Sequence, residues 1–163
     1  MATWRDVVDT EPDFAKRVQR IMDAYRHKTL ATLRADGAPR ISGIEASFID
    51  GELWFGSMPG ARKGRDLLRD PRFALHSGSI APARGDESQW PGDAKISGRA
   101  VPLIDPDQVA AILRAIEGPA DQPADLFRAD IAEVVITRVG DPPDHLVIEL
   151  WRPGAPLRRT TRT

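Results

Sequence analysis

The sequence predicts a mainly β fold (class β or α+β), an antiparallel barrel of about six strands with peripheral helices. Two Asp-Gly pairs, Asp36-Gly37 and Asp50-Gly51, each separate two segments of alternating polarity. This dipeptide is a strong hairpin signal because both of its positions tolerate positive φ. The 13 glycines and 14 prolines interrupt the chain at short intervals, which is typical of folds with many turns. The predicted strands also follow one another too closely for the crossovers that parallel strands require.

The first half of the chain is predicted to be a helix followed by a three-stranded meander. Pro12 opens the helix, which reaches about residue 26, and apolar residues recur along it at helical spacing. The strands of the meander are expected at Thr29–Arg34, Arg40–Ile49 and Glu52–Ser57. The two Asp-Gly turns join them.

The second half alternates strands with short helices. The expected strands are Phe73–Ser77, Asp93–Leu103, Ile131–Val139 and His145–Trp151; the expected helices are Arg62–Arg69, Pro106–Glu117 and a helical turn at Ala124–Ala129. Segment 80–92 is a predicted loop and segment 119–123 a linker. We expect one domain over residues 1–163, with the barrel over 28–151 and a basic tail over 152–163 that is either disordered or crosses to a partner subunit.

The composition excludes several classes of function. The chain has no cysteine among its 163 residues, so disulfides, iron–sulfur clusters, thiolate metal sites and cysteine nucleophiles are ruled out. Its three separated histidines, His27, His76 and His145, do not predict a metal site. A formal net charge of −1 argues against non-specific binding of nucleic acid, which requires a basic excess.

Targeting signals are not apparent in the sequence. No apolar run approaches the ~20 residues of a membrane-spanning helix. The first ten residues do not contain the apolar segment of a signal peptide. We therefore expect a cytoplasmic protein without a membrane partner.

Segment 54–67 carries the most specific chemical signal. A strand ends at Ser57, a loop that begins with Met58 follows, and a helix opens with Arg62 and Lys63. Backbone N–H groups at a helix start, a hydroxyl group and paired cations are the groups that bind a phosphate monoester. The alternative is a solvated turn with an exposed basic helix face.

Together with two further segments, this block resembles the pyridoxamine 5'-phosphate oxidase-like family of flavin-binding split β-barrels. The family has Tyr-Thr, a short loop, Ser-Arg-Lys-Gly and then an acidic-Leu pair. Here Ser57 stands at the Thr, and Arg-Lys-Gly at 62–64 and Asp-Leu at 66–67 follow in register. The resemblance spans about residues 29–159. It implies a six-stranded split barrel in which Ser57, Arg62 and Lys63 grip the phosphate of FMN.

The flanking strands match the family pattern less closely than this block does. Arg40 stands where the family has a flavin-binding Arg, but Glu45 replaces the Lys that follows five residues later, a reversal of charge. In the later strand that reaches the flavin of the partner subunit, Lys95 keeps a cation and Asp93 replaces a Gln. We therefore carry over Arg40 and Lys95 as flavin-binding candidates, with an ordinary strand residue as the alternative for each.

The C-terminal segment departs from the family. Trp151 and the turn after it are kept, and Trp151 is a candidate for lining the flavin pocket or for the core or a subunit interface. Leu157 and Arg159 stand where the family has the Arg-x-His that holds the pyridoxal substrate. Because this pair is missing, the resemblance implies an activity other than that of a true pyridoxine phosphate oxidase. His76 ends a strand that runs close to the flavin in related proteins, and is a candidate cofactor contact or a structural residue.

The acidic residues of the loop before the long strand are a further candidate. Asp86, Glu87 and Asp93 flank Trp90, and a carboxylate pair can serve acid–base catalysis. A solvated loop is the simpler interpretation. No catalytic residue is assigned.

Three functions follow from the resemblance. The first is an FMN-binding oxidoreductase that transfers a hydride to or from a small molecule, as a homodimer with flavin sites at the interface. The second is a deazaflavin-dependent reductase, for which Arg65, Arg69 and Arg84 would meet the anionic tail of the coenzyme. The third is a non-catalytic flavin- or haem-binding protein, with His76 or His145 as the axial ligand.

Overall fold

The structure is a computed structural model that describes residues 2–78, 86–116 and 123–163. Its helices are α1 (Trp4–Thr10), α2 (Pro12–Asp23), α3 (Arg62–Arg69) and α4 (Pro106–Ala115), with a 3-10 turn at Glu87–Gln89. Its strands are β1 (His27–Leu33), β2 (Pro39–Ile49), β3 (Glu52–Ser57), β4 (Arg72–His76), β5 (Asp93–Leu103), β6 (Asp125–Val139), β7 (Leu146–Trp151) and β8 (Arg158–Arg162).

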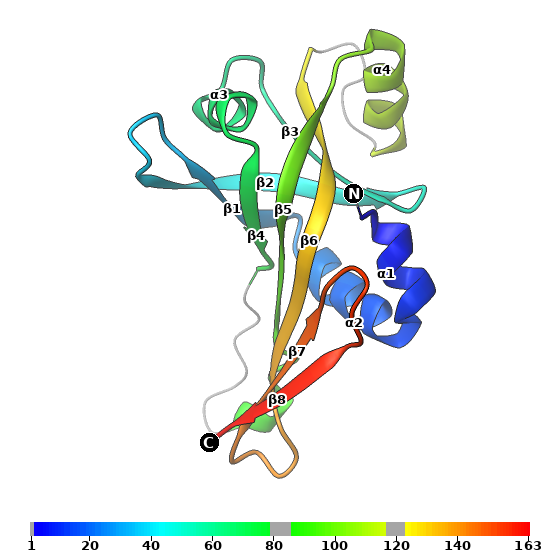
Figure 1. Ribbon diagram of the computed structural model, residues 1–163, viewed down its shortest axis with the longest axis vertical. Coiled ribbons are helices and arrows are strands. Elements are labelled where there is room, and N and C mark those ends of the chain that lie inside the picture. The colour runs from blue at the N-terminus through cyan, green and yellow to red at the C-terminus, as the bar shows by residue number, and fades with distance from the viewer. Residues whose placement is uncertain (1, 79–85, 117–122) are drawn as a thin grey trace.

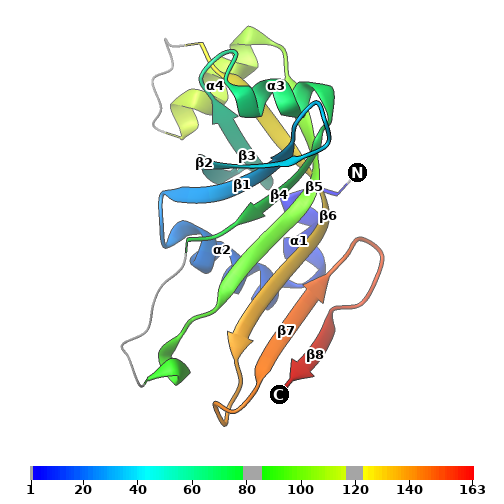
Figure 2. The same ribbon diagram turned by 90° about the vertical axis from the view of Figure 1, so that its left-hand side faces the viewer.

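The strands form one antiparallel sheet in the order β3-β2-β1-β4-β5-β6-β7-β8, and β3 also pairs with β6. This extra pairing closes six strands into a barrel, which confirms the predicted fold class. β7 and β8 continue the sheet beyond the barrel, and the C-terminus lies at their free edge (Figure 2). Figure 1 shows α3 and α4 together at one end of the molecule and α1 and α2 beside β6 and β7.

The predicted hairpins are present. Gly37 has a φ of 83°, and Asp50 and Gly51 have φ values of 52° and 80°, the left-handed conformations for which Asp-Gly is suited. β1 pairs with β2, and β2 with β3, in the expected meander. The ranges expected for α3, β3 and β5 match the observed elements.

Two expectations about secondary structure were wrong, and one helix, α1, was not predicted. Segment 124–129 is the first part of β6 and not a helical turn, because residues 125–128 pair with β3. The basic tail forms β8, which pairs with β7. The segment before Pro12 contains α1, whose capping box joins the Thr3 and Asp6 side chains to each other's backbone N–H groups. The last expected residue of α4, Glu117, and the linker 119–122 lie outside the described residues.

The hydrophobic core fills the barrel and continues between the β6–β7 extension and the two N-terminal helices. α2 buries Phe14, Val18 and Met22. Trp151 of β7 is 2% exposed, and its indole N–H donates to Thr10 Oγ1 of α1 at 2.9 Å. The two helices therefore cover one face of the extension and leave its other face continuous with the outer wall of the barrel.

Candidate functional site

α3 presents an open N-terminus at one end of the barrel. Arg62, Lys63 and Gly64 make up its first turn, and among the described residues no side chain caps it at Ala61. The first N–H groups of a helix lack intrahelical acceptors and carry partial positive charge. This end of α3 is therefore electrostatically favourable for an anion.

A buried carboxylate anchors α3 to the barrel. Asp66 is 3% exposed and accepts hydrogen bonds from Thr32 Oγ1 at 2.9 Å, Arg40 Nε at 2.6 Å and Arg69 at 3.0 Å. Burial alone would raise the pKa of Asp66, but the hydrogen bonds from Arg40, Arg69 and Thr32 outweigh it and hold the pKa below its ordinary value. Arg40 is thereby fixed against α3, with part of its charge neutralised.

The two basic residues of the first turn differ in their contacts. Lys63 Nζ donates to the carbonyl oxygen of Gly43 in β2 at 2.5 Å, which leaves two of the three ammonium donors for other partners. Arg62 is exposed. The structure thus brings Arg40, Lys63 and the start of α3 together over β2.

Ser57 lies under the same turn. A Cβ atom built on Gly64 would be 3.1 Å from Ser57 Oγ and 2.8 Å from Asp125 Oδ2, so a larger residue at this position would have to displace one of these side chains. Ser57 Oγ is buried and has no hydrogen-bond partner among the residues described. A buried hydroxyl without a partner calls for an explanation, and a ligand that reaches under this turn is one.

A second cluster lies where β4 ends and β5 begins. His76 Nε2 is 3.5 Å from Asp93 Oδ2, and Lys95 Nζ is 3.3 Å from Asp93 Oδ1. His76 Nδ1 also contacts the carbonyl oxygen of Ser77 at 2.7 Å. The carboxylate of Asp93 therefore joins the two predicted cofactor contacts, His76 and Lys95.

The outer wall of the barrel connects the two clusters. In the strand register, Gly43 of β2 is opposite Thr29, Thr29 is opposite His76, and His76 is opposite Lys95. The next row contains small residues at three of its four positions, Ala31, Ala74 and Ser97, together with Ile41, which is 75% exposed. The small side chains of Ala31, Ala74 and Ser97 leave a flat floor beside the row that runs from Gly43 to Lys95.

Of the other two predicted site residues, Met58 is 81% exposed in the loop between β3 and α3. Trp151 is enclosed in the core beneath α1, bonded to Thr10. Residues 80–85 of the predicted loop, Arg84 among them, lie outside the described residues, whereas Asp86 is exposed.

Glu45, which reverses the charge expected from the family, lies beside Arg26 and His27. Its carboxylate is 2.9 Å from Arg26 Nε and 3.5 Å from His27 Nε2. The Arg26 charge offsets that of Glu45, so its repulsion of an anionic ligand is reduced.

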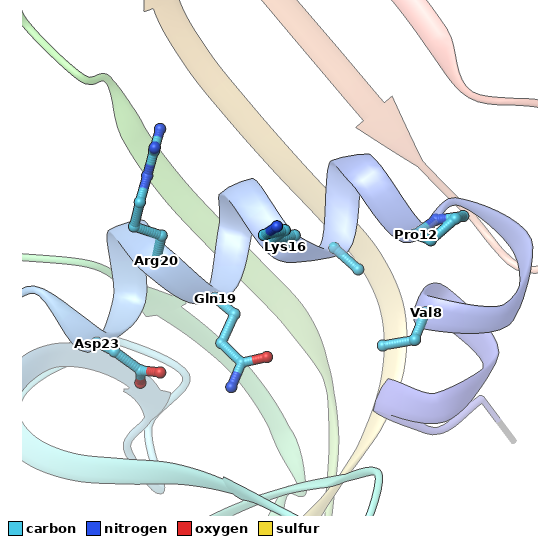
Figure 3. Close-up of a pocket in the computed structure, with 7 residues that line it drawn as sticks. Val8, Pro12, Lys16, Gln19, Arg20 and Asp23 are labelled. Atoms are coloured by element: carbon cyan, nitrogen blue, oxygen red, sulfur yellow. The ribbon is translucent and has the colours of Figure 1, made fainter.

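A shallow pocket of about 260 Å³ lies elsewhere, along the exposed side of α2. Figure 3 shows Lys16, Gln19 and Asp23 of α2 and Val8 of α1 around it. Its lining includes none of the eight residues predicted to contact a cofactor. Within the described part of the chain, no cluster of three or more His, Asp or Glu side chains could hold a metal ion, and no helix is long and apolar enough to cross a membrane.

Comparison with protein families identifies the chain's relatives. The family model described as pyridoxamine 5'-phosphate oxidase matches residues 14–138. The chain belongs to this family. The match includes the meander, α3 and the strands of both clusters. No curated protein matches the sequence.

Solved structures show that the fold is shared by proteins of different description. PhzG from Burkholderia lata, determined with tetrahydrophenazine-1-carboxylic acid, is 19% identical with a TM-score of 0.62, over 100% of this chain and 97% of that one. A heme binding protein from Mycobacterium smegmatis is 19% identical with a TM-score of 0.58, over 93% of this chain and 59% of that one. An F420 reductase is 16% identical with a TM-score of 0.50, over 73% of this chain and 93% of that one.

Sequence reasoning missed two residues of the site. Asp66 was recognised as part of the family motif, but its role as an anchor was not foreseen because Thr32 and Arg40 are distant in the chain. Asp125 was missed because a helical turn, and not a strand, was expected at residues 124–129. The alternation of Phe127, Ala129 and Ile131 with polar residues was the available signal for a strand there.

Proposed function

We propose that this protein is an FMN-binding oxidoreductase in which the start of α3 holds the phosphate of the flavin. The observation that carries the proposal is an open helix N-terminus with Arg62 and Lys63 in its first turn, beside the Ser57 hydroxyl at the end of β3, which has no hydrogen-bond partner within the described part of the chain. These are the groups that a phosphate monoester requires. Arg40, held beside α3 by Asp66, adds further positive charge.

The outer wall supports the same proposal for the ring system. Three strand spacings separate Gly43 from Lys95, which is about 14 Å, comparable to the span of a flavin mononucleotide. The small residues of the neighbouring row offer a flat surface beside this span, and His76 and Lys95 supply polar groups at its far end. A bound flavin would accept or donate a hydride there, while the chain's residues would position it and limit access of water.

We expect the outer wall also to contact a second copy of the chain. Ile41 is 75% exposed on this wall, and an exposed apolar side chain on a flat small-residue surface suits an interface. The expected assembly is a homodimer with the flavin sites at its interface. Sedimentation should therefore give a mass near twice 17.9 kDa; a monomer at micromolar concentration would contradict a shared site.

The deazaflavin-dependent reductase is the second candidate. Arg65 and Arg69 extend the basic surface of α3 beyond its first turn, and an F420 reductase shares the fold. The experiment is a titration of the apo-protein with FMN and, in parallel, with the deazaflavin coenzyme F420, followed by fluorescence. Tight binding of FMN supports the first candidate and preference for F420 the second. A Soret band in the absorbance spectrum of the purified protein would instead favour the non-catalytic haem-binding function.

Charge removal tests the phosphate site. Arg62→Ala and Lys63→Ala should each weaken FMN binding by about 1.5–3 kcal/mol, the contribution of a hydrogen bond to a charged group. Lys16→Ala is the matched control, because it removes an exposed lysine from α2. If both site variants bind FMN as tightly as the control, the phosphate is held elsewhere.

A further inference from the structure

Asp125 places a carboxylate inside the proposed phosphate site. It is the first residue of β6 and is opposite Ser57 in the register of β3 and β6. Its Oδ2 accepts the backbone N–H of Gly60 at 3.0 Å. Gly60 belongs to the turn that leads into α3, in which Ala61 N–H donates to the Met58 carbonyl.

The carboxylate oxygen also lies against the first turn of α3. Oδ2 of Asp125 would be 2.8 Å from a Cβ on Gly64, and Ser57 Oγ would be 3.1 Å from the same position. The carboxylate and the hydroxyl therefore lie on the same side of the turn. An anion is thus already present among the Gly60 N–H, the Ser57 hydroxyl and the helix start.

We propose that Asp125 is a specificity-determining residue that occupies the place of a phosphate oxygen when no ligand is bound. This inference rests on the proposed function. A phosphate monoester carries close to two negative charges at neutral pH, and a fixed carboxylate beside it disfavours binding. The incoming phosphate must displace Asp125 from Gly60, or bind beside it against the repulsion. The carboxylate therefore lowers the affinity of the site for a dianionic phosphate below the value that its cations and N–H groups alone would give.

The test compares FMN with riboflavin, which lacks the phosphate. Asp125→Asn keeps the size of the side chain and an oxygen for the Gly60 N–H but removes the charge. It should tighten FMN binding by about tenfold or more and leave riboflavin binding unchanged. Asp36→Asn is the matched control, because Asp36 also accepts one backbone N–H, from Ala38 at 2.9 Å, in an exposed hairpin.

A second readout separates this inference from the proposed function. The melting temperatures of the wild type, Asp125→Asn and Asp36→Asn are measured with inorganic phosphate at constant ionic strength. A stabilisation by phosphate that grows in Asp125→Asn alone supports the inference, even if no variant binds FMN and the flavin function is thereby overturned. Asp125→Ser replaces Asp125→Asn if the latter does not fold.

Two results would overturn the inference. In the first, the wild type binds FMN and Asp125→Asn binds it equally well or more weakly, which means that the carboxylate organises the loop without competing with phosphate. In the second, no variant binds FMN and phosphate stabilises none of them more than another, which removes the anion site and the proposed function together.

Discussion

Two buried carboxylates, Asp66 and Glu149, each join separate elements of the fold by accepting hydrogen bonds from arginines. Asp66 is 3% exposed and accepts hydrogen bonds from Thr32, Arg40 and Arg69. Glu149 is fully buried, and Arg17 and Arg159 donate to it, the latter at 2.8 Å. Arg138 Nε lies 3.7 Å from the same carboxylate.

The two clusters differ in what they join. The Asp66 cluster connects α3 with β1 and β2, so it supports the helix start that is proposed to bind phosphate. The Glu149 cluster connects α2, near one end of the chain, with β8 at the other end. A buried ion pair can thus serve stability alone or couple stability to a ligand site, depending on the element that it anchors.

The largest expected effect is on Glu149. Glu149→Gln should lower the free energy of unfolding by about 4–5 kcal/mol, the upper part of the range for breaking a buried ion pair, because three arginines lose their counter-charge. FMN affinity should not change. Urea unfolding measures the first quantity and fluorescence titration the second. Glu133→Gln is the control, since its pair with Arg152 is exposed and worth at most ~1 kcal/mol.

The same carboxylate predicts a dependence of stability on pH. Burial would raise the pKa of Glu149, but the hydrogen bonds and charges of Arg17 and Arg159 outweigh it and lower the pKa from 4.5 to about 2. The folded protein therefore binds fewer protons than the unfolded chain between these values. About 3 kcal/mol of stability, present above pH 4.5, should be lost as the pH falls toward 2. Urea midpoints at intervals of pH measure it, and Glu149→Gln should show a flatter profile.

Removal of the Asp66 charge should cause a smaller loss of stability than removal of the Glu149 charge, together with weaker binding of FMN. Asp66→Asn retains an acceptor oxygen but loses the charge, at an expected cost of about 2–3 kcal/mol. Because α3 is then less firmly held, FMN affinity should also fall. The comparison of the two regions breaks down if Asp66→Asn loses stability with no change in the affinity for FMN, or if Glu149→Gln lowers that affinity.

The local parts of the fold were predictable from the sequence, and the long-range parts were less so. Asp36-Gly37 and Asp50-Gly51 determine their hairpins through backbone preferences that act within four residues. Pairing of Ser57 with Asp125 depends on barrel closure, for which neither segment carries a local signal. β8 was missed because Arg158–Arg162 is too polar for a buried strand, and its stability comes from pairing with β7 and from the Arg159–Glu149 contact.

The candidate site was only partly predictable, because some of its residues are close in the sequence and others are brought together by the fold. The motif around Arg62 and Lys63 is contiguous, so family resemblance could point to it. Two carboxylates act on this motif through tertiary contacts. Asp66 is hydrogen-bonded to Arg40, and Asp125 accepts the N–H of Gly60. Trp151 was a plausible pocket residue from its position after β7, but nothing local indicated that α1 would cover it.

The most direct test of the proposed phosphate site is the ratio of the affinities for FMN and riboflavin, measured for the wild type and for the Arg62→Ala/Lys63→Ala double variant. We predict that the wild type binds FMN at least about tenfold more tightly, the least that one charge-assisted hydrogen bond contributes. In the double variant, the ratio should fall toward one. Equal affinities of the wild type for both flavins, or a ratio that the double variant does not change, would contradict a phosphate site at the start of α3.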